Sequence, residues 1–290
     1  MEAITREEKI MTGADLTPIT RKELFLAKAA GRDVQTPTPI TREEMFLSEI
    51  GGGTGGDTGG GNKLTAVVDR TITELTAADL AGVTSIGSSA FNGCSVLTSI
   101  TLPNSLKVID KSAFASCEAL TSISIPNGVS EIRDYAFSNC KNLTNIALPD
   151  SLTVLGGSAF LSCEALTSIS IPNGVKYLKS YLFRDCKSLI SVSLPNNLTQ
   201  IGQSVFQGCN GLTNITIPSR VTRIEGSAFY QCTGLSSVTL LSSSITYFAS
   251  NVFSDCTNLT TINVPWAEGA VANAPWGATN ATINYNYTGE

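Results

Sequence analysis

Eight cysteines recur at near-constant spacing, and they are the residues of this sequence best suited to covalent or metal chemistry. Successive cysteines are 23 residues apart six times and then 24 residues apart. Thiols of this kind can form disulfides, bind zinc or act as nucleophiles. The eight residues are Cys94, Cys117, Cys140, Cys163, Cys186, Cys209, Cys232 and Cys256.

The regular spacing favours a structural role for these thiols over a reactive one. No pair is spaced as C-x-x-C and the chain contains no histidine, which excludes the usual zinc sites and every histidine-based triad. Cysteines stacked on neighbouring parallel strands would lie slightly too far apart for good disulfide geometry. We therefore expect buried, reduced thiols, with no metal ion and no cofactor. The alternative is a series of disulfides between stacked turns.

A second group of residues has the chemistry of a binding site. Tyr135 and Tyr181 share one repeat phase, which places them about 10 Å apart on one side of a stack of parallel strands. Exposed tyrosine and arginine side chains often carry most of the binding energy of an interface. The alternative is a set of ordinary solvated corner residues. The predicted ligand-binding residues are Arg133, Tyr135, Lys176, Tyr177, Lys179, Tyr181 and Arg184.

Composition narrows the function further. The net charge of −5 and the pI of about 4.9 argue against nucleic-acid binding, which needs a basic face. No apolar run is long enough to predict membrane insertion. The carboxylates are scattered, so we expect no enzymatic activity.

The charged N-terminus lacks the apolar core of a signal peptide. We therefore expect synthesis in a cytoplasm, followed by association with a virion or by a non-classical route to the cell surface.

The elements that must position these residues follow the same 23-residue period. A phenylalanine precedes each cysteine by three residues and a leucine follows each by three. In the segment 120–126, LTSISIP, apolar and polar residues alternate, which predicts a short strand ended by proline. Leu120, Ile123 and Ile125 should point inward and Ser122 and Ser124 outward. The residues expected to follow inward in the same turn are Val129, Ile132, Ala136 and Phe137.

A period in this range predicts a solenoid, and the motif resembles that of a known family. The segment 120–140 reads LTSISIPNGVSEIRDYAFSNC and is similar to the repeat of BspA-like, Treponema pallidum-type leucine-rich-repeat proteins. The resemblance covers roughly residues 83–265. It implies a β-rich, α/β horseshoe-like solenoid of about eight turns that acts as a non-catalytic binding or adhesion module, as is typical of bacterial surface proteins.

The segments outside the repeats predict four further units. Residues 62–82 carry apolar residues without the motif and are predicted to cap the solenoid of residues 83–264 at its start. Residues 265–290 hold both tryptophans and are predicted to cap its end. Residues 51–61 are a glycine-rich flexible linker. Residues 1–50 contain three Thr-x-x-Glu capping boxes, at Thr5, Thr20 and Thr41, which predict three short helices that need a partner.

The N-terminal segment also resembles proteins associated with the tails of prophages in gut Firmicutes, through its repeated ITR-x-E segments ahead of a glycine-rich linker. This resemblance implies an anchoring segment within a larger assembly. The sequence therefore predicts a recognition or adhesion module for a protein or glycan ligand on a cell surface, with a phage tail receptor-binding component as one form of it. The alternative is a purely structural spacer or assembly protein of a phage tail or surface layer.

Overall fold

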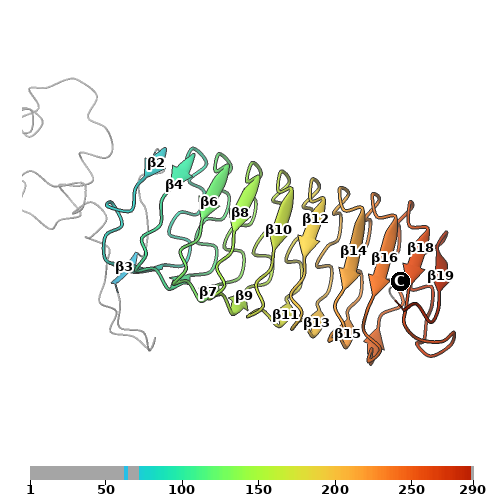
Figure 1. Ribbon diagram of the computed structural model, residues 1–290. Helices are drawn as coiled ribbons and strands as arrows, with labels where there is room; N and C mark the ends of the chain where they lie inside the picture. Colours follow the sequence, from blue (N-terminus) through green and yellow to red (C-terminus); the bar gives the residue numbers. More distant parts are fainter. Residues whose placement is uncertain (1–61, 65–71, 289–290) are drawn as a thin grey trace, which may run out of the picture.

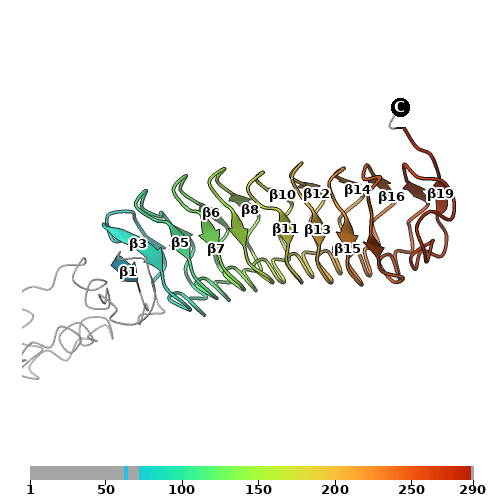
Figure 2. The ribbon, with the colours of Figure 1, turned by 90° about the horizontal axis from the view of Figure 1, so that it is seen from below.

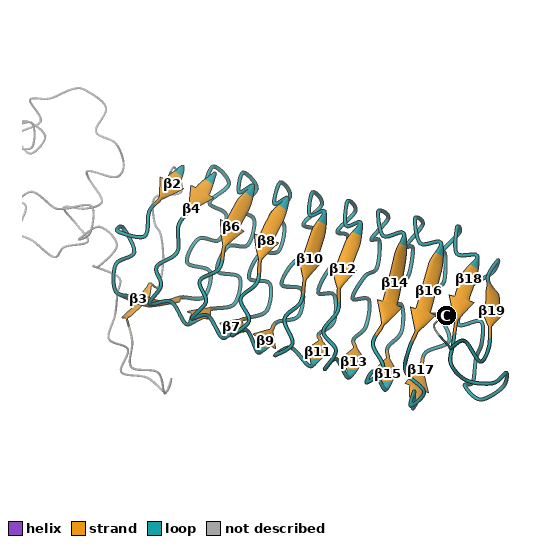
Figure 3. Cartoon of the chain, in the orientation of Figure 1, coloured by secondary structure: helices purple, strands orange, loops and turns teal. Residues whose placement is uncertain are grey.

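The computed structural model describes residues 62–64 and 72–288, which form one elongated solenoid of about nine turns (Figure 1). The fold class predicted from the repeat is confirmed. The segment 1–50, with its predicted helices, and the linker 51–61 lie outside the described residues. Within the described residues the solenoid contains strands and turns and no α-helix (Figure 3).

One row of parallel strands forms the face that we call the major face, and it runs the length of the solenoid (Figure 1). Its strands are β2 (Glu74–Leu75), β4 (Ser99–Ile100), β6 (Ser122–Ser124), β8 (Asn145–Ala147), β10 (Ser168–Ser170), β12 (Ser191–Ser193), β14 (Asn214–Ile217), β16 (Ser237–Leu240), β18 (Thr261–Asn263) and β19 (Thr282–Asn284). Strand β6 is the strand expected at residues 120–126: Ile123 is buried and Ser122 and Ser124 are exposed.

A second row of shorter parallel strands forms the minor face, seen from below in Figure 2. Its strands are β1 (Asn62–Leu64), β3 (Val83–Ile86), β5 (Val108–Ile109), β7 (Glu131–Ile132), β9 (Val154–Leu155), β11 (Tyr177–Leu178), β13 (Gln200–Ile201), β15 (Arg223–Ile224) and β17 (Tyr247–Phe248). The sequence indicated that Val129 and Ile132 point inward, and both are fully buried. It did not indicate that this segment pairs as a second sheet.

The third side of each solenoid repeat is a tight backbone turn that carries the Phe and Cys of the motif. An α/β horseshoe has a helix on this side. In seven of the eight motif repeats two residues adopt a positive φ there, for example Ser158 and Ser162. Left-handed residues interrupt a right-handed helix, so this side of the turn stays short.

Ladders of identical residues fill the core. Eight phenylalanine rings stack from Phe91 to Phe253 with neighbouring centroids 4.9–5.6 Å apart. The Leu of each repeat is buried. Ala136 and Phe137 are also buried, as the sequence predicts. Because every turn buries its side chains against the next one, stability is shared between neighbouring turns.

The ends of the solenoid add strands in the same register. Strand β19 pairs with β18, and Trp276 lies 23 residues after Phe253, at the phase of the motif phenylalanine. Trp276 is fully buried, with its ring centroid 4.4 Å from that of Phe248 and 6.4 Å from that of Trp266. These added strands explain why the solenoid has about nine turns and the motif appears eight times.

Candidate functional site

The eight cysteines lie inside the solenoid and not at a reactive surface. All eight are buried, and none of them forms a disulfide. Each thiol from Cys117 onward donates a hydrogen bond to the carbonyl oxygen of the motif phenylalanine in the preceding turn, at 3.0–3.2 Å. Burial raises the pKa of Cys140 to about 12 and also raises the pKa of Cys163. Thiols with these properties are poor nucleophiles.

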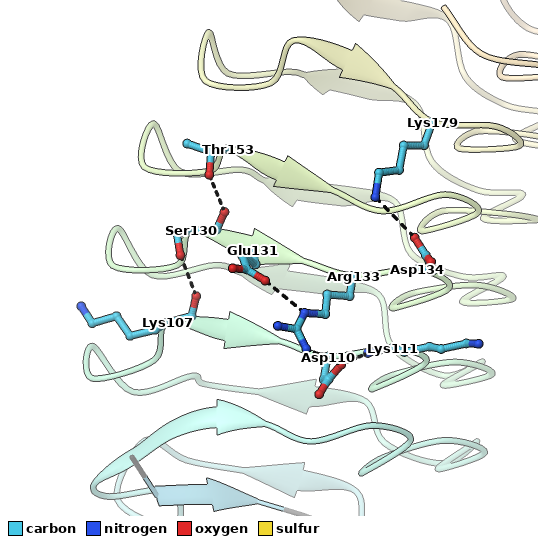
Figure 4. A network of polar contacts seen from close by, with 9 residues as sticks. All are labelled: Lys107, Asp110, Lys111, Ser130, Glu131, Arg133, Asp134, Thr153 and Lys179. Atoms are coloured by element: carbon cyan, nitrogen blue, oxygen red, sulfur yellow. Dashed lines mark hydrogen bonds and ion pairs between the residues drawn. The ribbon is translucent and has the colours of Figure 1, made fainter. Parts of the chain in front are cut away.

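Arg133 is the centre of an ion-pair network on the corner that follows the minor face (Figure 4). Its Nε lies 3.0 Å from Glu131 Oε2 and its Nη1 lies 3.2 Å from Asp110 Oδ1 in the preceding turn. The hydrogen bond to Glu131 is the main reason that the pKa of Arg133 is raised. Arg133 is therefore held in place by two carboxylates and presents only part of its guanidinium to solvent.

Tyr135 and Tyr181 lie on the same corner, two turns apart. The N–H of Tyr135 donates to the carbonyl of Gly157, and the N–H of Ser158 in that middle turn donates to the carbonyl of Ser180. Two parallel steps separate the tyrosines, which agrees with the spacing of about 10 Å expected from the repeat. The turn between them has the small residues Gly156, Gly157 and Ser158 at the corner.

Basic side chains accompany both tyrosines. Lys111 Nζ lies 5.9 Å from the ring centroid of Tyr135, and the Arg184 guanidinium carbon lies 5.7 Å from that of Tyr181. Arg184 Nε is also 3.3 Å from Asp185 Oδ2. Lys179 Nζ reaches Asp134 Oδ1 at 4.0 Å, and Figure 4 shows this pair beside the Arg133 network. We call Arg133, Tyr135, Lys179, Tyr181 and Arg184 the corner patch.

The other two predicted residues lie elsewhere on the turn. Lys176 and Tyr177 belong to the minor face, where Tyr177 begins β11. The Tyr177 hydroxyl reaches the next turn, 3.0 Å from where a Cβ on Gly202 would stand. The structure therefore divides the seven predicted residues between two adjoining surfaces, and their role in binding stays a prediction.

Sequence reasoning missed two exposed residues that the structure aligns with Tyr177. Arg223 and Tyr247 occupy the same position of β15 and β17, and the Arg223 guanidinium carbon lies 4.2 Å from the Tyr247 ring centroid. The signal that would have found them is the repeat phase, because residues 177, 200, 223 and 247 follow the 23- and 24-residue steps of the cysteines.

Within the described residues no group of His, Cys, Asp and Glu side chains is arranged to hold a metal ion. No helix there has the length and apolar character to cross a bilayer.

Comparison with known proteins is decisive for the family. The model of the BspA type leucine-rich repeat region matches residues 70–190 and 176–270, with six copies of the repeat. The chain belongs to the BspA-type leucine-rich-repeat family. Proteins with this repeat are scaffolds that are typically non-enzymatic.

Two solved structures of leucine-rich-repeat proteins show the same fold. One is from Bacteroides ovatus: it is 29% identical, has a TM-score of 0.56, and the match covers 74% of this chain and 61% of that one. The other is from Treponema pallidum: it is 26% identical, has a TM-score of 0.53, and the match covers 77% of this chain and 91% of that one. No curated protein matches the chain. The phage-tail resemblance of residues 1–50 falls outside the matched and described residues and stays a prediction.

Proposed function

We propose that this protein is a non-enzymatic recognition module that presents the outer surface of a rigid solenoid to a protein or glycan ligand. The fold and family support a binding or adhesion module in general terms. The corner patch is the proposed binding site. We also propose that it binds its ligand on a cell surface, with a receptor-binding component of a phage tail as one form of this role.

One observation carries the choice of the corner patch. Tyr135 and Tyr181 adopt φ angles of 59° and 62°. The same position in five other turns is serine with a similar φ: Ser89, Ser112, Ser158, Ser204 and Ser227. A bulky residue in the left-handed region is rare and strained. At this φ a tyrosine should stabilise the fold less than serine does, which favours a binding role for the two tyrosines at the surface.

The alternative function is a structural spacer of a phage tail or surface layer, in which residues 1–50 join an assembly and the solenoid sets a distance. The hydroxyl and amide side chains of the major face support this alternative in part. They form an even, exposed row from Ser99 to Thr216 that lacks large side chains suited to anchoring a ligand.

The test is binding of the full-length chain to intact bacterial cells, host-matrix proteins and immobilised glycans. The informative variant is Tyr135→Ser with Tyr181→Ser, since serine already occupies this position in neighbouring turns. Ile190→Thr is the matched control: Ile190 is 56% exposed, and most turns have threonine at its phase. Saturable binding that the double variant loses and the control keeps would support the proposal.

Two results would count against the corner patch. Unchanged binding of the double variant to every one of these ligands would place the site elsewhere. Incorporation into a larger assembly through residues 1–50, without saturable binding to any of these ligands, would favour the spacer.

A further inference from the structure

The minor face carries a straight row of large exposed side chains in its C-terminal half. Strands β11, β13, β15 and β17 pair in parallel, so that Tyr177, Gln200, Arg223 and Tyr247 occupy equivalent positions. Their strand neighbours Leu178, Ile201, Ile224 and Phe248 point into the core. Tyr177 and Tyr247 are 38% and 41% exposed, and three strand steps, or about 14 Å, separate them. We call these four residues the tyrosine–arginine row.

Side chains at both ends of the row reach an adjoining turn. The Tyr177 hydroxyl lies over Gly202 in the next turn, where the absence of a side chain leaves room for it. Arg223 stacks on the ring of Tyr247 and pairs through Nε with Glu225. An aromatic ring therefore stands at each end, with an amide and a guanidinium group between them.

The charge of the chain changes sign at this row. Residues 176–225 contain six Lys or Arg and two Asp or Glu, whereas residues 72–175 contain four and eight. Lys179 and Lys187 pair with Asp134 and Glu164 of earlier turns, so the basic side chains beside the row are Lys176, Arg220 and Arg223. Lys176 precedes Tyr177, and the exposed Arg220 lies three residues before Arg223. A local excess of one charge on a chain of net charge −5 attracts an anionic ligand to that site and repels it from the preceding turns.

We propose that the tyrosine–arginine row binds an acidic polysaccharide that lies along the solenoid axis. The apolar C–H faces of sugar rings pack on the ring of Tyr177 and on the face of Tyr247 that Arg223 does not cover. The amide of Gln200 hydrogen-bonds sugar hydroxyls, and the carboxylates pair with Arg223 and Lys176. A linear polymer suits contacts that lie on one line across a sheet, whereas the anchor residues of protein interfaces cluster centrally in packed pockets.

This inference rests on the proposed recognition function but places the ligand on different residues. The experiment measures the affinity of the full-length chain for polygalacturonate and for hyaluronate. The controls are methyl-esterified polygalacturonate, which keeps the backbone and loses the charge, and polyglutamate, which keeps the charge and is a polypeptide. The row variants are Tyr177→Gln and Tyr247→Gln, because Gln200 already occupies this position in the row, together with Arg223→Gln.

We expect binding to at least one acidic polysaccharide that weakens as salt rises and is much weaker for the methyl ester. Each tyrosine variant should lose about tenfold in affinity, as expected for an anchor residue. The corner-patch variant Tyr135→Ser with Tyr181→Ser should bind these polymers unchanged, which separates failure of this inference from failure of the proposed function. Thermal unfolding of each variant checks that the fold is intact.

Four results would overturn the inference. They are no binding to either acidic polysaccharide, equal binding to the methyl ester, tyrosine-dependent binding to polyglutamate, and row variants that bind as the unaltered chain does. A fifth comparison uses Lys141→Gln, which removes an exposed lysine paired with Glu118 in the acidic turns. A loss equal to that of Arg223→Gln would show general charge attraction and would also reject a site at the row.

Discussion

The Cys163 thiol donates a hydrogen bond of 3.1 Å to the carbonyl oxygen of Phe137, one turn earlier in the solenoid. The same bond recurs in the turns on either side, from Cys140 to Phe114 and from Cys186 to Phe160. The Phe137 carbonyl also accepts a backbone hydrogen bond from Cys140 N–H, at 3.2 Å. The motif cysteine therefore fills a small apolar space and adds a second hydrogen bond to a buried carbonyl oxygen, which has two lone pairs.

Alkaline pH should destabilise the solenoid steeply. Burial raises the pKa of Cys140 from its ordinary value of 9.0 to about 12. Between these two values the unfolded chain loses the proton and the folded chain keeps it. Stability is therefore complete below pH 9 and falls above it, by about 1.4 kcal/mol per pH unit for each such thiol. Urea unfolding between pH 8 and 11 measures this slope, and Cys140→Ala should make it shallower. An unchanged midpoint up to pH 11 would contradict the assignment.

Alkylation should distinguish the last cysteine from the others. The Cys232 thiol can donate a hydrogen bond to the thiolate of Cys256, which lowers the pKa of Cys256, whereas burial raises the pKa of Cys140 and Cys209. Only the thiolate reacts, so iodoacetamide at pH 8 should modify Cys256 well before Cys140 or Cys209. Peptide mass spectrometry gives the order, and guanidinium-unfolded protein, in which all eight thiols react, is the control. Equal modification of Cys140 and Cys256 in the folded chain would disprove this prediction.

Removing one ring from the phenylalanine stack should destabilise the whole solenoid. Phe160 is fully buried, and its ring centroid lies 5.6 Å from those of both Phe137 and Phe183. Phe160→Ala should lower the free energy of unfolding by about 3–5 kcal/mol, because it leaves a cavity between two turns. Ile190→Ala, at an exposed position, should change it by less than about 0.5 kcal/mol. Urea denaturation compares the two, and similar midpoints would refute the prediction.

Gly156 marks a close approach of two turns. A Cβ at this position would lie 2.3 Å from the backbone carbon of Arg133 and from the backbone nitrogen of Asp134. Gly156→Ala should therefore destabilise by about 1–3 kcal/mol or more, since backbone cannot move aside as a side chain can. Gly226→Ala is the control, because its closest neighbour is the Asn251 side chain at 3.1 Å. Thermal unfolding should show a clear loss for the first variant alone.

Replacing Tyr181 with glycine should raise the stability of the chain. Its φ is 62°, so Tyr181→Gly should relieve backbone strain and stabilise the chain by about 1 kcal/mol. Tyr177→Gly, within strand β11, should instead destabilise, because glycine weakens a strand. Thermal midpoints measure both changes. A lower midpoint for Tyr181→Gly would mean that contacts of the tyrosine ring outweigh the strain.

The period of 23 residues is sufficient to predict most of the fold. Phe, Cys and Leu at fixed spacing must stack on their equivalents in the next turn, because each turn can bury its apolar side chains only against its neighbours. The alternation of apolar and polar residues, and their position in the repeat, predict that Ile123 and Ile132 point inward and that Ser122 points outward. The structure confirms all three.

Only the tertiary structure decided how the exposed residues group. The sequence joined Tyr177 with Tyr181, which are close in number, but the chain turns a corner between them. The lateral pairing of strands instead aligns Tyr177 with Arg223 and Tyr247, which are 46 and 70 residues away. The sequence by itself determined which side chains are buried, since burial repeats with every turn. The neighbours of an exposed residue depend on strand register and on the direction of each corner, which are properties of the folded chain.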